Sequence, residues 1–222
     1  MTVVQCLLLA AGIESCIRCG LIQSNTGDIL KAENAQKARK LKLEEQTRLY
    51  DLVEQESAPQ FARLEALLSA LSNAQSQEEA KPLLGHIAVI MTYIKRRSNL
   101  VFLAAQKNFI DANELLLCLN ESAQALQLCK VLCTVRLKLG ENISAVQAIA
   151  LYDLFGAVLD TGRSLTAMLL FIEQSGGVLR ARVSASCTES LDVLCSRFDG
   201  LTAEHDEDGL WHLTWTLPEV TA

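Results

Sequence analysis

Residues 191–218 read LDVLCSRFDGLTAEHDEDGLWHLTWTLP, and this run already shows much of the fold. A short helix is predicted over Thr188 to Arg197, because its apolar residues recur at helical spacing. Strands are predicted over residues 201–204 and 210–217, which are rich in Leu, Thr and Trp. The polar residues 206–209 (DEDG) lie between these strands and are typical of a hairpin turn.

The second of these strands also predicts which way its side chains point. Trp211, Leu213 and Trp215 alternate along it and therefore share one face. We expect that face to meet the core, while His212 and Thr214 point away from it.

The same pattern continues toward the N-terminus. Helices, strands and turns alternate over residues 111–128 (helix), 131–139 (strand), 140–142 (turn), 144–160 (helix), 165–173 (strand), 176–177 (turn) and 178–183 (strand). The order from residue 111 is α-β-α-β-β-α-β-β. This order predicts a mixed sheet with helices on one face.

A helical hairpin is predicted before this domain. Residues 28–80 contain no glycine, and Tyr50, Ser57, Leu64 and Leu71 recur every seven positions. A polar turn over residues 73–79 leads to a second helix, whose apolar positions are Leu83, Ile87, Ile90, Ile94 and Val101. One hairpin cannot bury two apolar faces, so we expect a homodimer with a four-helix bundle. The predicted domains are 1–27 (apolar N-terminal segment), 28–108 (hairpin) and 109–222 (α/β sandwich).

Composition and charge argue against two classes of function, nucleic-acid binding and metal binding. The chain has 222 residues with a net charge of −6, which argues against a dedicated nucleic-acid binder. The eight cysteines lie mostly in apolar stretches, as free thiols of a cytoplasmic protein do. Cys16 and Cys19 form one C-x-x-C pair, and a structural metal site needs four ligands, so no metal is expected. The run Lys95-Arg96-Arg97 is interpreted as a solvated helix face, with an acidic lipid or partner as the alternative.

The first residues leave two interpretations open. Residues 3–13 are apolar except for Gln5, but a membrane-spanning helix needs about 20 apolar residues. The run is either a short packed helix or the end of a membrane segment. The predicted location is the cytoplasm, with membrane contact through residues 1–22 as the alternative.

Several strings resemble sensor histidine kinases. ALYDLFGAVLD (150–160) stands where the N-box helix of their ATPase-like domain lies, and SGGVLRARV (175–183) resembles the hairpin that follows it. Residues 191–218 resemble the closing helix and hairpin, which end in Leu-Pro. The resemblance implies an α+β chain: a dimerising helical hairpin followed by an α/β sandwich of the fold shared with gyrase and the 90 kDa heat-shock chaperone.

The N-terminal half resembles one sub-group of these kinases. LYDLVEQESAPQFARLEALL (49–68) and YIKRRSNLVFL (93–103) are similar to membrane-anchored kinases of Gram-positive bacteria. IESCIRCGLIQSN (13–25) resembles the cytoplasmic end of their last membrane helix.

The phosphoacceptor of that family is missing. Active members place a histidine five residues before a proline on the first hairpin helix. Here Pro59 is preceded at that distance by Glu54, followed by Gln55, and residues 28–80 contain no histidine. His86 on the second helix is interpreted as a helix-face or buried histidine rather than as a displaced acceptor.

The nucleotide-binding residues are missing as well. The N-box requires an Asn for Mg²⁺ and a Glu, and residues 150–160 offer apolar side chains or glycine at those places. Asp153 and Asp160 flank these positions and would serve only in a shifted register. Residues 184–189 (SASCTE) lack the Asp and glycines of the adenine-binding loop.

These residues predict a degenerate, catalytically inactive histidine-kinase-like protein that acts as a dimeric scaffold in two-component signalling. The expected partners are a response regulator or a genuine kinase, docking near Glu54, Gln55 and Pro59, and no cofactor is expected. The alternative is a divergent sensor histidine kinase that still binds ATP and Mg²⁺ and phosphorylates a partner, with His86 as its phosphorylated residue.

Overall fold

The computed structural model describes the backbone of residues 3–176 and 178–218, and the side chains of residues 31–217 except 32, 52 and 177. The chain divides into two compact units, residues 1–52 and 53–222. The first helix, α1 (Val3–Asn73), supplies the described backbone of the first unit. The predicted boundaries after residues 27 and 108 stay predictions.

The first unit is a polar helix where its side chains are described. Residues 33–48 are exposed throughout, and Lys40 and Glu44 form an ion pair one turn apart at 3.8 Å. In the described part of the chain, no helix is both long and apolar enough to span a membrane. Cys16, Cys19 and the apolar residues 3–13 lie outside the described side chains.

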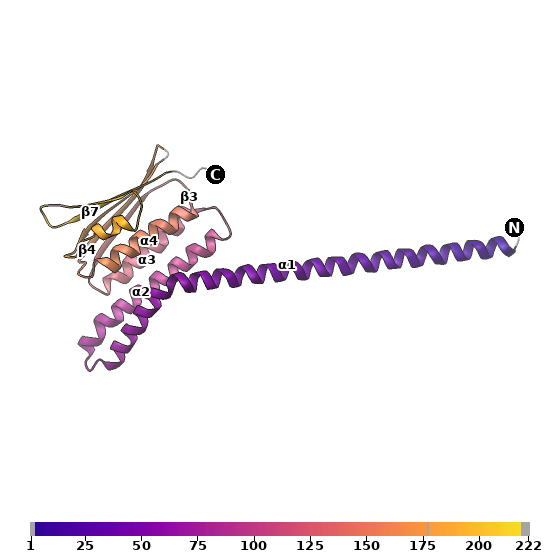
Figure 1. The fold of residues 1–222 in the computed structure, drawn as a ribbon, viewed down its shortest axis with the longest axis horizontal. Helices are drawn as coiled ribbons and strands as arrows, with labels where there is room; N and C mark the ends of the chain where they lie inside the picture. The colour runs from indigo at the N-terminus through magenta and orange to yellow at the C-terminus, as the bar shows by residue number, and fades with distance from the viewer. Residues whose placement is uncertain (1–2, 177, 219–222) are drawn as a thin grey trace. The chain divides into compact units, whose positions relative to one another are not determined.

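The second unit holds the end of α1 and eleven further elements (Figure 1). They are α2 (Gln77–Ala104), β1 (Phe109–Asp111), α3 (Ala112–Gln127), β2 (Leu132–Lys138), β3 (Asn142–Ser144), α4 (Ala145–Thr161), β4 (Ala167–Ser175), β5 (Val178–Ser186), the 3₁₀ helix η1 (Asp192–Ser196), β6 (Leu201–His205) and β7 (Trp211–Pro218).

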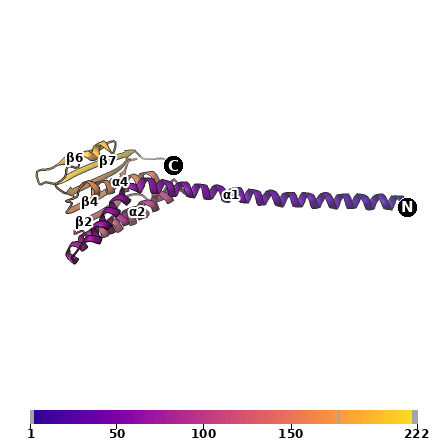
Figure 2. The ribbon, with the colours of Figure 1, turned by 60° about the horizontal axis from the view of Figure 1, so that its bottom comes forward.

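Five strands form a mixed sheet in the order β2-β4-β5-β7-β6. The β2–β4 pair is parallel and the other pairs are antiparallel. Helices α3 and α4 cover one face of this sheet, and α2 packs on their other side (Figures 1 and 2). The expected mixed sheet with helices on one face is therefore confirmed.

The core lies between the sheet and α4. Leu151, Leu154 and Phe155 of α4 are almost fully buried, as are Leu170 of β4 and Leu213 of β7. Trp211 and Trp215 are also buried, so the predicted core-facing side of β7 is confirmed. Burying each large side chain contributes about 1.5–3 kcal/mol to folding.

Polar side chains cap the N-terminal ends of two helices. Asp111 begins α3, and its carboxylate accepts a hydrogen bond from the backbone N–H of Asn113 at 2.8 Å. Ser76 begins α2 and accepts from the N–H of Glu79 at 3.2 Å. The Glu79 carboxylate accepts in turn from the N–H of Gln75 at 3.0 Å, which closes a reciprocal cap.

The structure differs from the sequence-based expectation at three places. The predicted turn at residues 140–142 runs into β3, which pairs with the unexpected strand β1. The helix expected over 188–197 is a 3₁₀ helix of five residues. Helix α1 begins far before residue 28. The short strands were missed because three residues show no alternation, and their pairing is a tertiary contact.

Candidate functional site

Helices α2 and α4 meet along a line of polar contacts, and α4 carries residues 150–160, where the N-box was expected. We call this contact the α2–α4 interface; it consists of Glu56, Tyr93, Arg97, Asp153 and Gly156. All five lie in the second unit of the chain. The interface contains Asp153, one of the two carboxylates singled out from the sequence.

Asp153 is held by an arginine of the hairpin. Arg97 Nε lies 2.6 Å from Asp153 Oδ1, and Arg97 Nη2 lies 3.0 Å from Oδ2. The same guanidinium donates to Glu56 Oε2 of α1 at 2.7 Å. A two-pronged arginine–carboxylate pair of this kind is strong and directional. Asp153 therefore has a cation on both of its oxygens.

The second carboxylate is engaged in the same way. Asp160 Oδ1 lies 2.5 Å from Nη1 of Arg63, on the part of α1 that belongs to the second unit. Asp153 and Asp160 are seven residues apart, so they lie on the same side of α4. The fold brings both predicted carboxylates together on one helix face, and it pairs each with an arginine of the hairpin.

Tyr93 fills the space between the two helices. A Cβ atom built on Gly156 would lie 2.3 Å from Tyr93 Cε2. The Tyr93 ring stacks on Tyr152 with a centroid distance of 5.2 Å. Its hydroxyl donates to Asp153 Oδ1 at 3.0 Å. Helix α2 can approach α4 this closely because position 156 has no side chain.

Burial and hydrogen bonds shift the pKa values of two residues of this interface. Burial, followed by the nearby negative charge of Asp153, raises the pKa of Tyr93 far above its usual range. Burial alone would lower the pKa of Arg97, but hydrogen bonds to Asp153 and Glu56 outweigh it and raise that pKa. Tyr93 therefore stays neutral and Arg97 stays charged at physiological pH.

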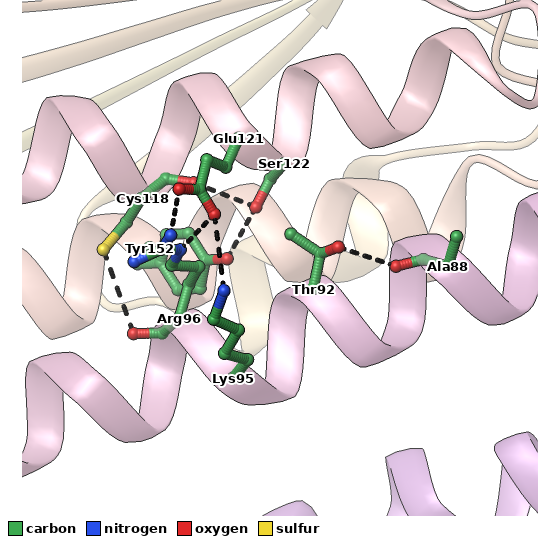
Figure 3. Close-up of polar contacts among 8 residues, drawn as sticks. All are labelled: Ala88, Thr92, Lys95, Arg96, Cys118, Glu121, Ser122 and Tyr152. Atoms are coloured by element: carbon green, nitrogen blue, oxygen red, sulfur yellow. Dashed lines mark hydrogen bonds and ion pairs between the residues drawn. The ribbon is translucent and has the colours of Figure 1, made fainter.

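A second set of contacts joins α2 to α3 (Figure 3). Arg96 forms an ion pair with Glu121 of α3, and Lys95 lies 3.9 Å from the same carboxylate. The hydrogen bond from Arg96 is the main cause of the lowered pKa of Glu121. Beneath this pair, the hydroxyls of Ser122 and Tyr152 lie 2.7 Å apart.

The basic run 95–97 was interpreted wrongly from the sequence. The side chains of Arg96 and Arg97 are only 12% and 13% exposed, and both pair with acids on other helices. Only Lys95, at 64% exposed, behaves as a solvated residue. The interpretation followed the usual behaviour of charged runs. The sequence gives no sign of the acidic partners, because they lie 25 and 56 positions away.

The remaining predicted site residues lie elsewhere. Glu54, Gln55 and Pro59 of α1 are exposed. His86 is exposed on α2, with Nδ1 2.9 Å from the carbonyl oxygen of Pro82. Among the described residues, no group of three or more His, Cys, Asp or Glu side chains is arranged to hold a metal ion.

No protein-family model and no curated protein matches the chain. The solved structures similar to it include a bacterial phosphotransferase, with 9% identity, a TM-score of 0.44, and coverage of 79% of this chain and 96% of that one. The histidine kinase AdeS of Acinetobacter baumannii has 12% identity, a TM-score of 0.36, and coverage of 75% and 98%. The histidine kinase domain of a blue-light-activated kinase from Erythrobacter litoralis has 14% identity, a TM-score of 0.38, and coverage of 71% and 95%. At these scores none of the similarities establishes an activity or a site for this chain.

Proposed function

We propose that this chain is a histidine-kinase-like protein of two-component signalling that has lost kinase chemistry and works as a dimeric scaffold for protein partners. The observation that carries the proposal is the α2–α4 interface. The helix that carries the expected N-box residues, α4, is packed against the chain's own helix α2, with the Tyr93 ring against Gly156.

Charge supports the same conclusion. Magnesium requires several oxygen ligands, and a nucleotide site of this type takes one of them from the N-box helix. On α4 the two carboxylates flanking the N-box positions are neutralised by Arg97 and Arg63. In the shifted register that would use Asp153 and Asp160 as ligands, binding Mg-ATP would require both ion pairs to break.

The proposed partners are a second copy of the chain and a response regulator or a genuine kinase. Phe61 and Leu68 of α1 and Leu84 and Met91 of α2 are large apolar side chains that are each about half exposed. A second hairpin would bury them in a four-helix bundle. Glu54, Gln55 and Pro59 are exposed on the same hairpin, and a receiver domain would dock there.

The first experiment is a calorimetric titration of the folded chain with Mg-ATP, with Mg-ADP as the control. We expect no saturable heat. A Kd below about 1 mM, or about 4 kcal/mol of binding free energy, would instead favour the divergent-kinase alternative. In that case the Asp153→Asn and Asp160→Asn variants test whether these carboxylates hold the metal, and phosphorylation of His86 is sought by mass spectrometry.

Partner binding is tested separately with a panel of purified receiver domains from the same cell. The variant is Glu54→Lys, and the matched control is Glu65→Lys, since both glutamates are exposed on α1. We expect the first variant alone to weaken binding of the receiver domain. Equal affinities for the two variants, or transfer of a phosphoryl group from this chain to the receiver, would contradict the proposal.

A further inference from the structure

Strand β2 is the end strand of the five-stranded sheet, and β4 is its only partner among the described strands. Leu132 donates its backbone N–H to the carbonyl oxygen of Thr166 at 2.9 Å, so its polar backbone groups point toward β4. The N–H and C=O of one residue point to the same side of a strand, and successive residues alternate between the two sides. Cys133, Val135 and Leu137 therefore direct these groups away from β4, and the outer edge of β2 can pair with another strand.

The apolar layer of the sheet is incompletely buried at this edge. The side chains of Cys133, Val135 and Leu137 pack against the core, but each of them stays partly exposed. Met168 and Ile172, their register partners on the neighbouring strand β4, are only 3% and 0% exposed. An added strand with apolar side chains on this face would complete the burial of the three β2 side chains.

The other face of β2 carries two cations. Arg136 and Lys138 alternate with the apolar residues, and both are exposed. Lys138 lies opposite Glu173 in register, but the Glu173 carboxylate is 2.8 Å from Arg182 of β5 and is neutralised there. Within the described part of the chain, neither Arg136 nor Lys138 forms an ion pair. Their charges are therefore available to a partner.

These two cations discriminate between partners. A second copy of β2, paired edge to edge, would gather four cations on one face, and like charges on neighbouring strands are destabilising. Because Arg136 and Lys138 are two positions apart, alternate residues of an added strand would lie opposite them. Carboxylates at those alternate positions would form favourable cross-strand pairs. Charge complementarity therefore favours an acidic partner over a second copy.

We propose that the outer edge of β2 binds an extended segment of a partner protein in which acidic and apolar residues alternate. The acidic side chains face Arg136 and Lys138, and the apolar ones cover Cys133, Val135 and Leu137. The main chain of the segment pairs with the outward N–H and C=O groups of β2, as in other cases of strand addition. The inference goes beyond the proposed function and does not rest on it, because dimerisation and receiver docking were assigned to the hairpin.

The first test measures peptide binding to the full chain by fluorescence anisotropy. Two fluorescein-labelled peptides have seven residues, the length of β2. One alternates valine with glutamate, and the other has lysine in place of glutamate. We expect saturable binding of the glutamate peptide and about tenfold weaker binding of the lysine peptide, because lysine repels Arg136 and Lys138. Added salt should weaken the glutamate peptide.

Two further peptides test whether the main chain pairs with β2. They repeat the glutamate peptide with N-methyl groups on every valine or on every glutamate, which removes those N–H donors. In an antiparallel addition the valine N–H groups face β2, and in a parallel addition the glutamate N–H groups do. We expect one of these peptides to lose measurable binding and the other to keep it. Equal affinities of all three glutamate peptides, or loss of binding by both N-methyl peptides, would overturn the proposal.

Charge reversal locates the site on the protein. Arg136→Glu should weaken the glutamate peptide about three- to tenfold and strengthen binding of the lysine peptide. The matched control is Arg180→Glu, since Arg180 is also exposed but lies on β5, two strands in from β2. An added strand would lie about 14 Å from β5, beyond the screening length at physiological salt, so the control should bind both peptides as the wild type does. Equal effects of the two variants would contradict a site at the edge.

One more variant distinguishes the possible occupants of the edge. Val135→Pro removes an outward N–H that does not bond to β4, and proline is tolerated at such edge positions. This variant should lose the glutamate peptide, and a cooperative thermal transition shows that it is folded. A lower mass of Val135→Pro in sedimentation velocity would show instead that β2 pairs with a second copy. A single-stranded oligonucleotide that binds more tightly than the peptide and loses affinity in Arg136→Glu would show a phosphate-binding face. Either result, or no saturable peptide binding, would overturn the proposal.

Discussion

The ring of Tyr93 occupies the space that a side chain at position 156 would need. A Cβ on Gly156 would lie 2.3 Å from Cε2 and 2.8 Å from the hydroxyl oxygen of Tyr93. Helix α2 therefore packs against α4 at a contact that admits only glycine. The glycine sits in a buried helix, where it would otherwise be unfavourable.

This contact predicts that the effect of Gly156→Ala on the free energy of unfolding changes sign when the Tyr93 side chain is removed. Gly156→Ala should destabilise the wild type by about 1–3 kcal/mol, because the methyl group overpacks the interface. In a Tyr93→Ala background the same substitution should stabilise by up to about 1 kcal/mol, because alanine is the better helix former. Urea unfolding measures both values. Equal effects in the two backgrounds would show that α2 does not pack here in solution.

The two arginine–aspartate pairs should differ in strength. Arg97 and Asp153 are 13% and 23% exposed, whereas Arg63 and Asp160 are 40% and 43% exposed. A cycle of Arg97→Met with Asp153→Asn should give a coupling free energy of about 1–3 kcal/mol. The cycle of Arg63→Met with Asp160→Asn should give less than about 1 kcal/mol. Chemical unfolding of the wild type and the six variants compares them, and equal couplings would contradict this ranking.

The exposed apolar side chains of the hairpin predict self-association. Phe61→Glu and Leu68→Glu should each weaken a homodimer, because a charge would have to be buried in the bundle. Leu132→Glu is the control, since Leu132 is 75% exposed on the edge strand β2. Sedimentation velocity gives the mass of each species. A monomeric wild type at tens of micromolar would refute the predicted dimer.

Stability should fall at high pH because of a buried thiol. Burial raises the pKa of Cys118 from its ordinary value of 9.0 to about 11. Because the folded-state pKa is raised, the unfolded chain loses its proton first, and stability is lost as pH rises from about 9 to about 11. Cys118→Ala should remove this part of the decline, measured as Tm between pH 8 and pH 11. If Tm falls equally with pH in the wild type and the variant, Cys118 is not a buried, neutral thiol.

Replacing Lys130 by glycine should increase the stability of the protein. Its φ is 62°, the left-handed region that a side chain disfavours, at the turn between α3 and β2. Lys130→Gly should raise the free energy of unfolding by up to about 1 kcal/mol, measured with urea. Lys138→Gly in strand β2 is the control and should lower it. A lower free energy of unfolding for both variants would show that the Lys130 side chain stabilises the turn.

Elements with strong local patterns could be predicted from the sequence. Asp111 marked the start of α3, and the alternation of Trp211, Leu213 and Trp215 identified the buried side of β7, because both signals are local and follow backbone geometry. Strands β1 and β3 could not be predicted, since each has three residues and is defined by its partner. A helix was expected over Thr188 to Arg197, but only Asp192–Ser196 are helical, as the 3₁₀ helix η1.

In the candidate site, too, some features follow from the sequence and others from the tertiary structure. The sequence by itself determined which groups are absent: no histidine stands between residues 28 and 80, and residues 184–189 offer no Asp. It also singled out Asp153 and Asp160. Only the tertiary structure decided their partners, because Arg97 and Arg63 lie 56 and 97 positions away. The same holds for the contact of Tyr93 with Gly156. The residue type alone determines which chemical groups a side chain carries. Which groups pair and which are buried depends on how helices that are distant in the sequence pack together.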